Sequence, residues 1–502
     1  MQRQRRFVGH SVITHTFERE SHQMSGDKHS THPRRGVEEY RESEAYLQKR
    51  QLKSGTAGWV LLASLGVGYV ISGDYSGWNF GLAEGGFGGL AIAAVIIAGM
   101  YLALVLGMAE MSSALPAAGG GYTFARRALG PWGGFATGTA ILIEYAIAPA
   151  AIATFIGAYV ESLNLFGITD GWWIYLFVYA VFIGIHLSGV GEALKVMFVI
   201  TGIALVGLVV FAISAIGQFD STNLTDIAVT DAAGASAWLP YGLLGIWAAI
   251  PFAIWFFLAI EGVPLAAEEA ANPERNVPRG IIAAMAVLLV TCVTVLVLTT
   301  GAGGAAAMSE SGNPLVEALG DGTMAKVVNY IGLAGLIASF FSIIYAYSRQ
   351  LFALSRAGYL PKVLSVTNSR KAPTLALVVP GLIGFALSLT GQGALLLNMA
   401  VFGAALSYVL MMVSHIVLRK RAPEMHRPYR TPGGVFTTGF ALVIAVIAVI
   451  ATFLVDYVAA LGCLIVFAGF MAYFGLYSRH HLVANSPDEE FAALAAAEDE
   501  LR

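Results

Sequence analysis

The stretch VISGDYSGWNFG, residues 70–81, follows an almost wholly apolar run, GWVLLASLGVGYV, at residues 58–70. It places the carboxylate of Asp74 between Gly73 and Gly77, inside a segment that otherwise has the composition of a membrane helix. A charged side chain at the centre of such a helix costs about 2.5–3.5 kcal/mol on insertion scales. An acid in this position therefore indicates a functional site.

The composition of the whole chain supports a membrane protein. Of its 502 residues, 57% are hydrophobic and only 12% are charged, against roughly 25% charged residues in soluble proteins. This balance predicts the lipid bilayer as the surroundings of the chain and no nucleic-acid partner. Cys292 and Cys463 lie in apolar runs without metal-ligand spacing, so we expect neither a metal site nor a disulfide framework.

A membrane-spanning helix needs about 20 mostly apolar residues. Runs of this kind predict an all-α membrane protein with about twelve transmembrane helices. Their predicted ranges are 57–83, 88–115, 132–161, 172–190, 194–217, 240–270, 279–304, 325–355, 374–391, 393–418, 434–454 and 456–478.

The lysines and arginines predict the orientation of these helices. If both ends of the chain face the cytoplasm, Lys326 is the one basic residue that falls on the outer side, as the positive-inside rule requires. We therefore expect a multi-pass protein of a bacterial cytoplasmic (inner) membrane. Residues 1–55 form a polar, basic N-terminal tail without the apolar core of a signal peptide, and residues 479–502 form an acidic tail. Met24 is a candidate true start, which leaves residues 1–23 as an extension.

Two of the predicted helices contain a break. The first is interrupted at Ser72–Gly77 and the sixth near Ala259–Pro264, where glycine and proline stand beside a glutamate. Interrupted helices in corresponding positions of two halves indicate an inverted-repeat transporter with a substrate site near the membrane midplane. The pattern divides the chain into a first five-helix repeat at 56–217, a second at 218–418, and two further helices at 419–478.

Three acids lie near mid-membrane in these spans: Asp74, Glu144 and Glu261. No lysine or arginine is predicted at the same depth, so the positive charge that they need comes from the substrate, from an ion or from protons. A protonated acid that only hydrogen-bonds a neighbouring helix is the structural alternative. Aromatic residues flank both breaks, including Tyr75 and Trp255, and aromatic faces attract organic cations by about 0.5–2 kcal/mol.

Four motifs in this sequence resemble those of the amino acid–polyamine–organocation transporter superfamily. They are AEMSSALPAAGGGYTFARRALGPWGGF (109–135), AEEAANPERNVPRG (267–280), SRQLFALSRAGYLPK (348–362) and RPYRTPGG (427–434). The resemblance implies a five-plus-five inverted repeat, two further helices, and alternating access around helices 1 and 6. Within the superfamily, residues 49–89 and the stretch IEYAIAPAAIA (143–153) look most like the bacterial ethanolamine permeases.

Amino-acid carriers of this superfamily typically have a glycine-rich G-S-G break in helix 1, whose free N–H groups receive the substrate carboxylate. The matching stretch here is Ser72-Gly73-Asp74. Two carboxylates at hydrogen-bonding range repel in a low-dielectric pocket, so we expect Asp74 to reject a carboxylate and attract an amine. Glu261 falls where relatives show F-x-G-x-E, with Ala259 in place of the usual glycine.

These observations predict a secondary transporter, not an enzyme, that imports ethanolamine or a similar small cationic amine. The alternatives are an amino-acid or polyamine permease of the same superfamily, and a membrane amine sensor that does not transport. No cofactor is predicted, and H⁺ coupling, Na⁺ coupling and uniport all remain open. The predicted substrate-binding residues are Ser72, Gly73, Asp74, Tyr75, Glu144, Trp255 and Glu261, and the candidates for the coupling ion are Glu144, Glu261, Ser339 and Ser342.

Overall fold

The structure is a computed structural model that describes residues 57–117, 119–163 and 171–482, together with residue 55. Almost all the elements in these residues are helices. The described part of the chain contains no β-strand, only two isolated bridges. The predicted N-terminal tail before residue 55 and the predicted acidic tail after residue 482 lie outside the described residues.

The predicted membrane helices are present. Nine helical stretches in the described residues are long and apolar enough to cross a membrane, and three further apolar helices are shorter. The main elements are α3 (Trp59–Val70), α4 (Ser72–Tyr75), α5 (Phe80–Ala114), α6 (Gly121–Ser162), α7 (Gly171–Leu187), α8 (Val190–Ile216), α9 (Gly242–Ala248), α10 (Ile250–Trp255), η3 (Ile260–Glu269), α11 (Pro273–Gly303), α14 (Thr323–Arg356), α15 (Thr374–Ser388), α16 (Gly393–Arg421), α17 (Val435–Val455) and α18 (Tyr457–Leu476).

Five short elements lie between these helices. They are η2 (Ser221–Thr225), α12 (Ala305–Met308), α13 (Pro314–Glu317), η4 (Lys362–Ser365) and η5 (Ser478–His480). In hydrocarbon every backbone polar group needs an internal partner, which a helix supplies within its own segment. The helical architecture is therefore the expected consequence of the apolar sequence.

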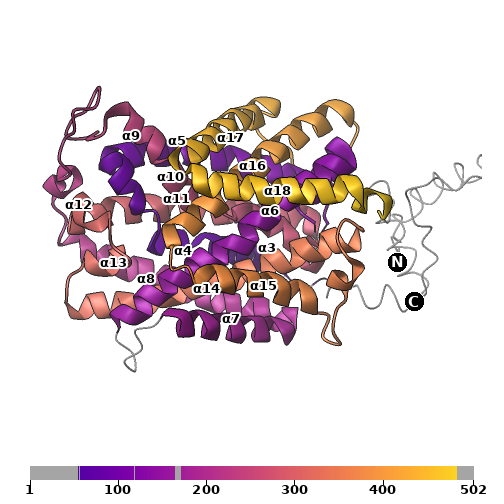
Figure 1. Cartoon of the computed structure of the whole chain (residues 1–502), viewed down its shortest axis with the longest axis horizontal. Helices are drawn as coiled ribbons and strands as arrows, with labels where there is room; N and C mark the ends of the chain where they lie inside the picture. The colour runs from indigo at the N-terminus through magenta and orange to yellow at the C-terminus, as the bar shows by residue number, and fades with distance from the viewer. Residues whose placement is uncertain (1–54, 56, 118, 164–170, 483–502) are drawn as a thin grey trace, which may run out of the picture.

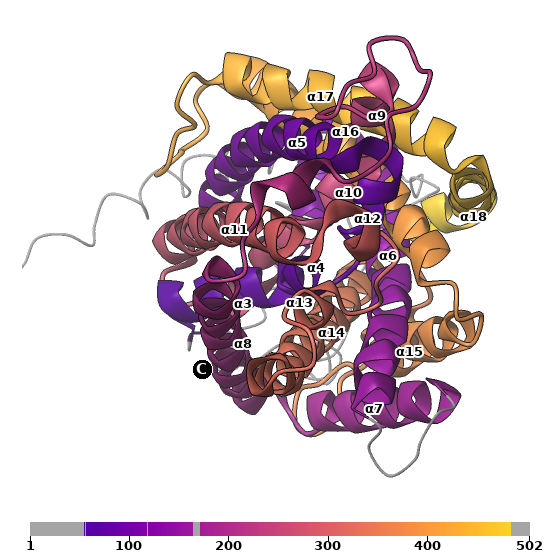
Figure 2. The same ribbon diagram turned by 90° about the vertical axis from the view of Figure 1, so that its left-hand side faces the viewer.

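The interrupted helix that contains Asp74 lies at the centre of the molecule. Figure 2 shows α4 near the middle, with α11 on one side and α6 on the other. In Figure 1 the helix α18 crosses the front of the bundle, and Figure 2 shows α17 and α18 at its outer edge. They pack mainly on α16, α5 and α6. The two last helices thus support the bundle from outside and leave the centre to the broken helices.

The break in the first helix lies later than the sequence predicts. The predicted interruption at Ser72–Gly77 is wrong in its first half, because Ser72–Tyr75 still forms a helical turn. The backbone becomes extended at Ser76 and left-handed at Gly77, where φ is +96°. Glycine adopts positive φ without the steric cost that other residues meet, so Gly77 fixes the position of the break.

The sixth helix is divided into three pieces, α9, α10 and η3. A turn at residues 256–259 separates α10 from η3, and Ala259 in this turn has a left-handed φ of +75°. The structure thus places the interruption a few residues before the predicted range Ala259–Pro264. Pro264 itself lies within η3, a 3₁₀ helix.

The two broken helices approach each other through Gly73. A Cβ atom built at Gly73 lies 2.4 Å from the carbonyl oxygen of Trp255 and 3.3 Å from the Cα atom of Phe256. Small residues permit such close approach of backbones where helices pack in membranes. Gly73 therefore holds α4 against the end of α10.

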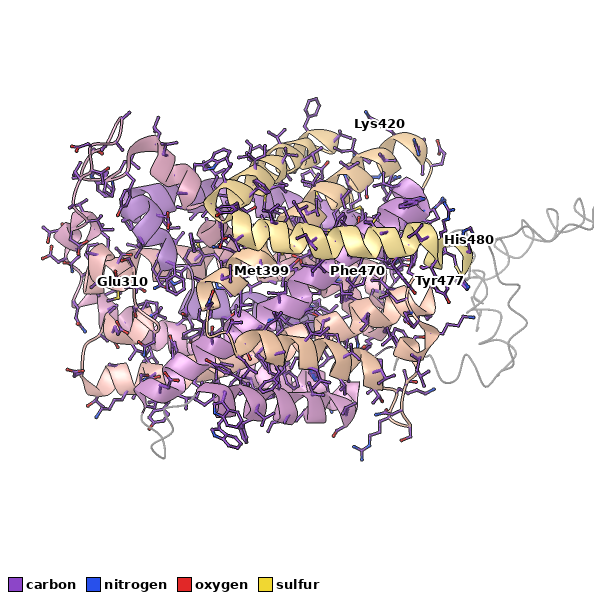
Figure 3. The ribbon with its side chains drawn as sticks, in the orientation of Figure 1. Glu310, Met399, Lys420, Phe470, Tyr477 and His480 are labelled. Atoms are coloured by element: carbon purple, nitrogen blue, oxygen red, sulfur yellow. The ribbon has the colours of Figure 1, made fainter. Side chains whose placement is uncertain are left out.

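The charged side chains differ between the two ends of the molecule. Figure 3 shows Glu310 at one end of the long axis, and Lys420 and His480 toward the other. Lys420 belongs to a basic cluster, Arg419–Arg421, in the last turn of α16. This distribution agrees in sense with the orientation that the sequence predicts, in which the Lys420 end faces the cytoplasm.

We expect Gly73→Ala to lower the thermal stability of the purified protein and to abolish its transport activity. The added methyl group overlaps the Trp255 carbonyl, and overpacking of this kind costs about 1–3 kcal/mol. Gly469→Ala in α18 is the matched control, because its added Cβ has no neighbour within 4 Å. Thermal melting in detergent, followed by size-exclusion chromatography, measures the difference. Equal melting of the two variants contradicts the close contact at Gly73.

Candidate functional site

A narrow central cavity, which leaves no space for a water molecule in this structure, lies where the broken helices meet α6 and α14. Ser72 at the start of α4 and Trp255 at the end of α10 both contribute to its wall. No lysine or arginine is among the residues around it. The lining residues are Tyr69, Val70, Ser72, Ile152, Trp255, Leu258 and Ile343.

Trp255 connects the two broken helices on one side of this cavity. Its indole N–H donates a hydrogen bond of 3.0 Å to the carbonyl of Ser76, at the break in the first helix. Its ring meets Phe155 of α6 edge to face, with centroids 6.1 Å apart. Trp255 thus lies at the cavity, and the hydrogen bond ties its position to the break.

Asp74 and Tyr75 face away from the central cavity. Asp74 is completely buried, its side chain faces Thr291 of α11, and neither of its oxygens has a hydrogen-bond partner among the described residues. The Tyr75 hydroxyl donates to the carbonyl of Ala204 in α8, at 2.6 Å. The structure therefore brings Ser72 and Trp255 together at the cavity and places Asp74 and Tyr75 on other sides of the same helix.

The other two predicted acids form a pair, which we call the acid pair. Glu144 of α6 faces Glu261 of η3, and both side chains are buried. Tyr145 donates a hydrogen bond of 2.8 Å to Glu261 Oε1, and Tyr408 of α16 donates one of 3.1 Å to Oε2. The oxygens of Glu144 have no hydrogen-bond partner in the described residues. Two carboxylates in contact repel unless they hold a proton or a cation between them.

Ser339 and Ser342 belong to α14 and face the first helix. The Ser339 hydroxyl accepts a hydrogen bond from the Ser72 N–H and donates one to the Gly68 carbonyl, both at 2.8 Å. The Ser342 hydroxyl donates to the Ala338 carbonyl within its own helix, at 2.6 Å. Ser339 therefore holds the start of α4 in place, which is a structural role whether or not an ion binds beside it.

Hydrogen bonds close the side of the cavity that is predicted to face outward. Asn79 donates to the carbonyls of Met308 and Ser311 in the segment after α11, at 2.8 and 2.9 Å, and Ser76 donates to that of Gly312. Beside this closure lies a polar pocket between α13 and α14. Its lining includes Glu317, Asp321, Lys326 and Asn329.

Ion pairs close the opposite side, at the predicted cytoplasmic end. Glu269 at the end of η3 pairs with Arg349 of α14 at 3.0 Å, and both side chains are buried. The neighbouring Glu268 pairs with Arg356 at 2.7 Å. The backbone of Ala57 also bonds to residues 269 and 271. With both sides closed, the cavity is occluded in this structure.

Glu110 holds a second charged cluster near the end of α5. It accepts hydrogen bonds from Arg419 and from the Thr431 N–H, forms an ion pair of 3.1 Å with Arg427, and lies 3.3 Å from the His415 ring. The cluster joins α5 to α16 and to the loop that precedes α17. This contact agrees with the interface role that its position at a helix end suggests.

Several site residues were not identified from the sequence. Tyr408, Tyr101 and Tyr69 surround the acid pair and the cavity, and Tyr101 donates to Tyr408 at 2.9 Å. Each lies in the apolar part of its helix, so the helical pattern gives these tyrosines no special position. Their polar hydroxyls inside membrane spans are the one signal that points to them, since buried tyrosine hydroxyls usually find a polar partner. Among the described residues, no group of three acidic, histidine or cysteine side chains suits a metal ion.

Comparison with known proteins supports the reading of a transporter. The family model described as "Amino acid permease" matches residues 61–485. An uncharacterized transporter of Rhizobium meliloti is 28% identical over 78% of this chain and 85% of its own length. The methylthioribose transporter of Bacillus subtilis is 29% identical, covering 84% of this chain and 93% of the relative. A branched-chain amino acid permease of the same organism is 26% identical over 79% and 87%, respectively.

We expect glycine to be tolerated better at position 259 than at a nearby helical alanine. At Ala259, relief of the left-handed backbone, worth about 1–2 kcal/mol, offsets the loss of a buried methyl group, about 0.8 kcal/mol. Ala253 is equally buried but helical, so Ala253→Gly loses about 1 kcal/mol of helix propensity instead. Melting of both variants in detergent tests this, and an equal loss of stability argues against the positive φ at Ala259.

Proposed function

We propose that this chain, which belongs to the amino acid permease family, is a secondary transporter that imports ethanolamine or a similar small cationic amine by alternating access. The occluded cavity between two broken helices is the geometry that alternating access requires. The cavity leaves no space for a water molecule in this structure, so a substrate can enter only when the broken helices move apart. Because the family consists of transporters, we do not propose an enzymatic activity for this chain.

One observation carries the choice of a cationic substrate. Asp74, Glu144 and Glu261 are buried in the centre of the molecule, and none forms an ion pair with a described residue. The nearest guanidinium in this region, that of Arg349, is already paired with Glu269. Buried charges in membrane helices usually pair with one another or mark the path of a substrate or ion. A substrate ammonium supplies the positive charge that the protein lacks here.

The backbone around the first break supports the same choice. A substrate carboxylate in this family is expected to need free N–H groups at the break. In this structure Ser72 N–H donates to Ser339, Asp74 N–H to the Ile71 carbonyl, and Ser76 N–H to the Ser72 carbonyl. These three donors are occupied, which leaves fewer N–H groups at the break for a substrate carboxylate.

We assign roles to the predicted site residues on this basis. Trp255 forms the wall against which the ammonium or the alkyl chain packs, with Ser72 as a polar contact at the start of α4. Glu261 and Glu144 bind the ammonium or a proton at the acid pair. Asp74 contributes negative charge from the α11 side of the helix, through the low-dielectric interior. Gly73 and Tyr75 shape the break rather than line the cavity in the occluded state.

An amino-acid substrate is the alternative, and the relatives favour it. Some of them are named as amino acid permeases, including the branched-chain amino acid permease of Bacillus subtilis. Another is named as a methylthioribose transporter, so the fold also serves substrates outside the amino acids. A sensor that binds an amine without moving it is separated from both by accumulation of label in sealed vesicles.

Coupling to an ion is a separate proposal. The acid pair suits proton coupling, because a proton between two carboxylates relieves their repulsion. Sodium coupling rests on Ser339 and Ser342, whose hydroxyl hydrogens already bond to backbone carbonyls. Replacing sodium by potassium in the uptake buffer distinguishes the two, and we expect unchanged uptake for a proton-coupled carrier.

Proteoliposomes with the purified protein should accumulate labelled ethanolamine. We expect unlabelled ethanolamine to compete and serine to compete at least tenfold more weakly, because the unpaired acids repel its carboxylate. A tenfold difference in affinity corresponds to about 1.4 kcal/mol. Repulsion between a buried carboxylate and the carboxylate of serine can supply a difference of this size. Choline as a third competitor tests whether the cavity admits a methylated ammonium.

Asp74→Asn tests the role of the first acid in the same vesicles. We expect the variant to lose at least nine tenths of ethanolamine uptake while it still elutes as a single species in size-exclusion chromatography. Asp231→Asn, at an exposed acid outside the helices, is the matched control and should transport normally. If serine competes as well as ethanolamine, or if Asp74→Asn transports normally, Asp74 does not select amines.

A further inference from the structure

A line of buried polar groups leads from the acid pair toward the predicted cytoplasmic end. It begins at Glu261, whose Oε1 accepts the hydrogen bond of the Tyr145 hydroxyl at 2.8 Å. The Tyr145 hydroxyl and the Tyr69 ring then meet over Gly262. A Cβ built on this glycine lies 3.0 Å from both the Tyr145 hydroxyl oxygen and a ring carbon of Tyr69. Gly262 thus leaves the space in which the two tyrosines approach each other.

The line continues from Tyr69 to the ion pair that closes the cavity. Tyr69 interacts electrostatically with Glu261 on one side and with Glu269 and Arg349 on the other. Tyr345 of α14 faces Glu269, and its ring lies under the Arg349 guanidinium, 4.1 Å from the ring centroid. Arg349 binds only Oε1 of Glu269, through two of its nitrogens. The second carboxylate oxygen, Oε2, has no hydrogen-bond partner among the described residues.

Unpartnered polar atoms concentrate along this line. The Tyr69 hydroxyl is buried without a partner in the described part of the chain. Tyr345 and Glu269 face each other, as do Glu144 and Glu261, without the full geometry of a hydrogen bond. Each such atom costs roughly 1–3 kcal/mol compared with a satisfied one. Several of them between one acid pair and one ion pair are expensive for packing alone, and unsatisfied groups in a native protein call for a functional explanation.

We propose that the acid pair holds one exchangeable proton and that the hydroxyls of Tyr145, Tyr69 and Tyr345 conduct it to Glu269 at the cytoplasmic ion pair. In this structure the Tyr145 hydroxyl donates to Glu261 and no hydrogen bond joins the three hydroxyls, so the transfer requires them to rotate into contact. A tyrosine hydroxyl both donates and accepts, so each then takes up one proton as it releases its own. The tyrosines end the step unchanged. One O–H bond breaks at the acid pair and one forms at Glu269 Oε2. This inference rests on the proposed transport function and specifies how its driving proton leaves.

The arrival of the proton at Glu269 has a consequence for the closed side of the cavity. A neutral Glu269 no longer attracts Arg349, and a buried pair that loses one charge becomes unfavourable. Arg349 is the cation that faces Glu269, and Glu268, Tyr345 and Tyr69 are the other titratable groups around it. Proton exit therefore weakens the contact between η3 and α14 that closes the cavity on this side.

Two assays on the same vesicles separate the relay from transport itself. The first measures exchange of external labelled ethanolamine for internal unlabelled ethanolamine, with labelled valine as the second probe. During exchange the carrier moves back across the membrane with substrate and proton still bound. Exchange therefore needs no net release of the proton into the vesicle. The second assay records acidification of the vesicle lumen with an entrapped pH-sensitive dye when the probe is added under an inward proton gradient.

We expect Tyr345→Phe to exchange within twofold of wild type and to acidify the lumen at least tenfold more slowly. Tyr179→Phe is the matched control, because Tyr179 is also a buried tyrosine of a membrane helix whose hydroxyl has no partner in the described residues. It packs against Phe340 and Phe385, away from the acid pair, so both rates should stay at the wild-type level. Glu144→Gln should abolish acidification, because one carboxylate of the pair is removed.

The outcomes divide clearly. If wild type exchanges either probe but never acidifies the lumen, or if Tyr345→Phe and Tyr179→Phe behave alike, the relay is wrong while the transport function stands. If wild type exchanges neither probe, the proposed function fails and the relay fails with it. Exchange by Tyr345→Phe shows that the variant is folded, so a loss of acidification cannot be assigned to misfolding.

Discussion

Negative charge without a basic partner in the centre of a membrane protein is the constraint on which the rest of this structure depends. Several basic side chains in the described bundle are paired elsewhere, such as Arg349 with Glu269, and Arg419 and Arg427 with Glu110. Those pairs satisfy the acids near the helix ends. The acids at the centre therefore need a charge that arrives from outside, as a proton or as a cationic substrate.

The two closures of the cavity differ in kind, and this difference bears on how it opens. On the predicted outer side, Asn79 holds the backbone of residues 308–311 through neutral hydrogen bonds. On the predicted cytoplasmic side, the buried pair of Glu269 with Arg349 and the partly exposed pair of Glu268 with Arg356 hold η3 against α14. Neutral hydrogen bonds exchange readily for bonds to water when a surface opens, whereas removing one charge from a buried pair changes its energy by several kcal/mol. Charge movement therefore controls the inner closure much more strongly than the outer one.

The sequence predicted the fold well because the signals of a membrane protein are long and repeated. Twelve apolar runs, two breaks in corresponding positions and the distribution of lysine and arginine need no knowledge of packing. Short-range detail was harder. The Ser339 hydroxyl of α14 takes the place of the helical bond between Ser72 N–H and the Gly68 carbonyl, and the extended backbone follows only at Ser76. That contact joins residues 267 positions apart, so no local pattern contains it.

The sequence predicted which types of residue form the candidate site, but it did not predict which way their side chains point. Glu144 and Glu261 were singled out one at a time, each as an acid inside an apolar helix. Their pairing depends on how α6 packs against η3, and the tyrosines that hold Glu261 come from α6 and α16. The side of a helix that a residue occupies changes by about 100° with each position. A break that moves by a few residues therefore turns Asp74 from the cavity toward α11.

This rotation alters what the carboxylate of Asp74 does without removing its importance. A group that lines a cavity selects its substrate by contact, and a group behind the wall selects it through the field that it creates. In a low-dielectric interior that field decays slowly, because the energy of two charges scales inversely with the dielectric constant. Asp74 is completely buried and its oxygens have no partner in the described residues, so its charge is screened little by the protein. The proposed preference for an ammonium over a carboxylate therefore does not require Asp74 to line the cavity, and contacts with a bound substrate fall instead to walls such as those formed by Trp255, Ile152 and Ile343.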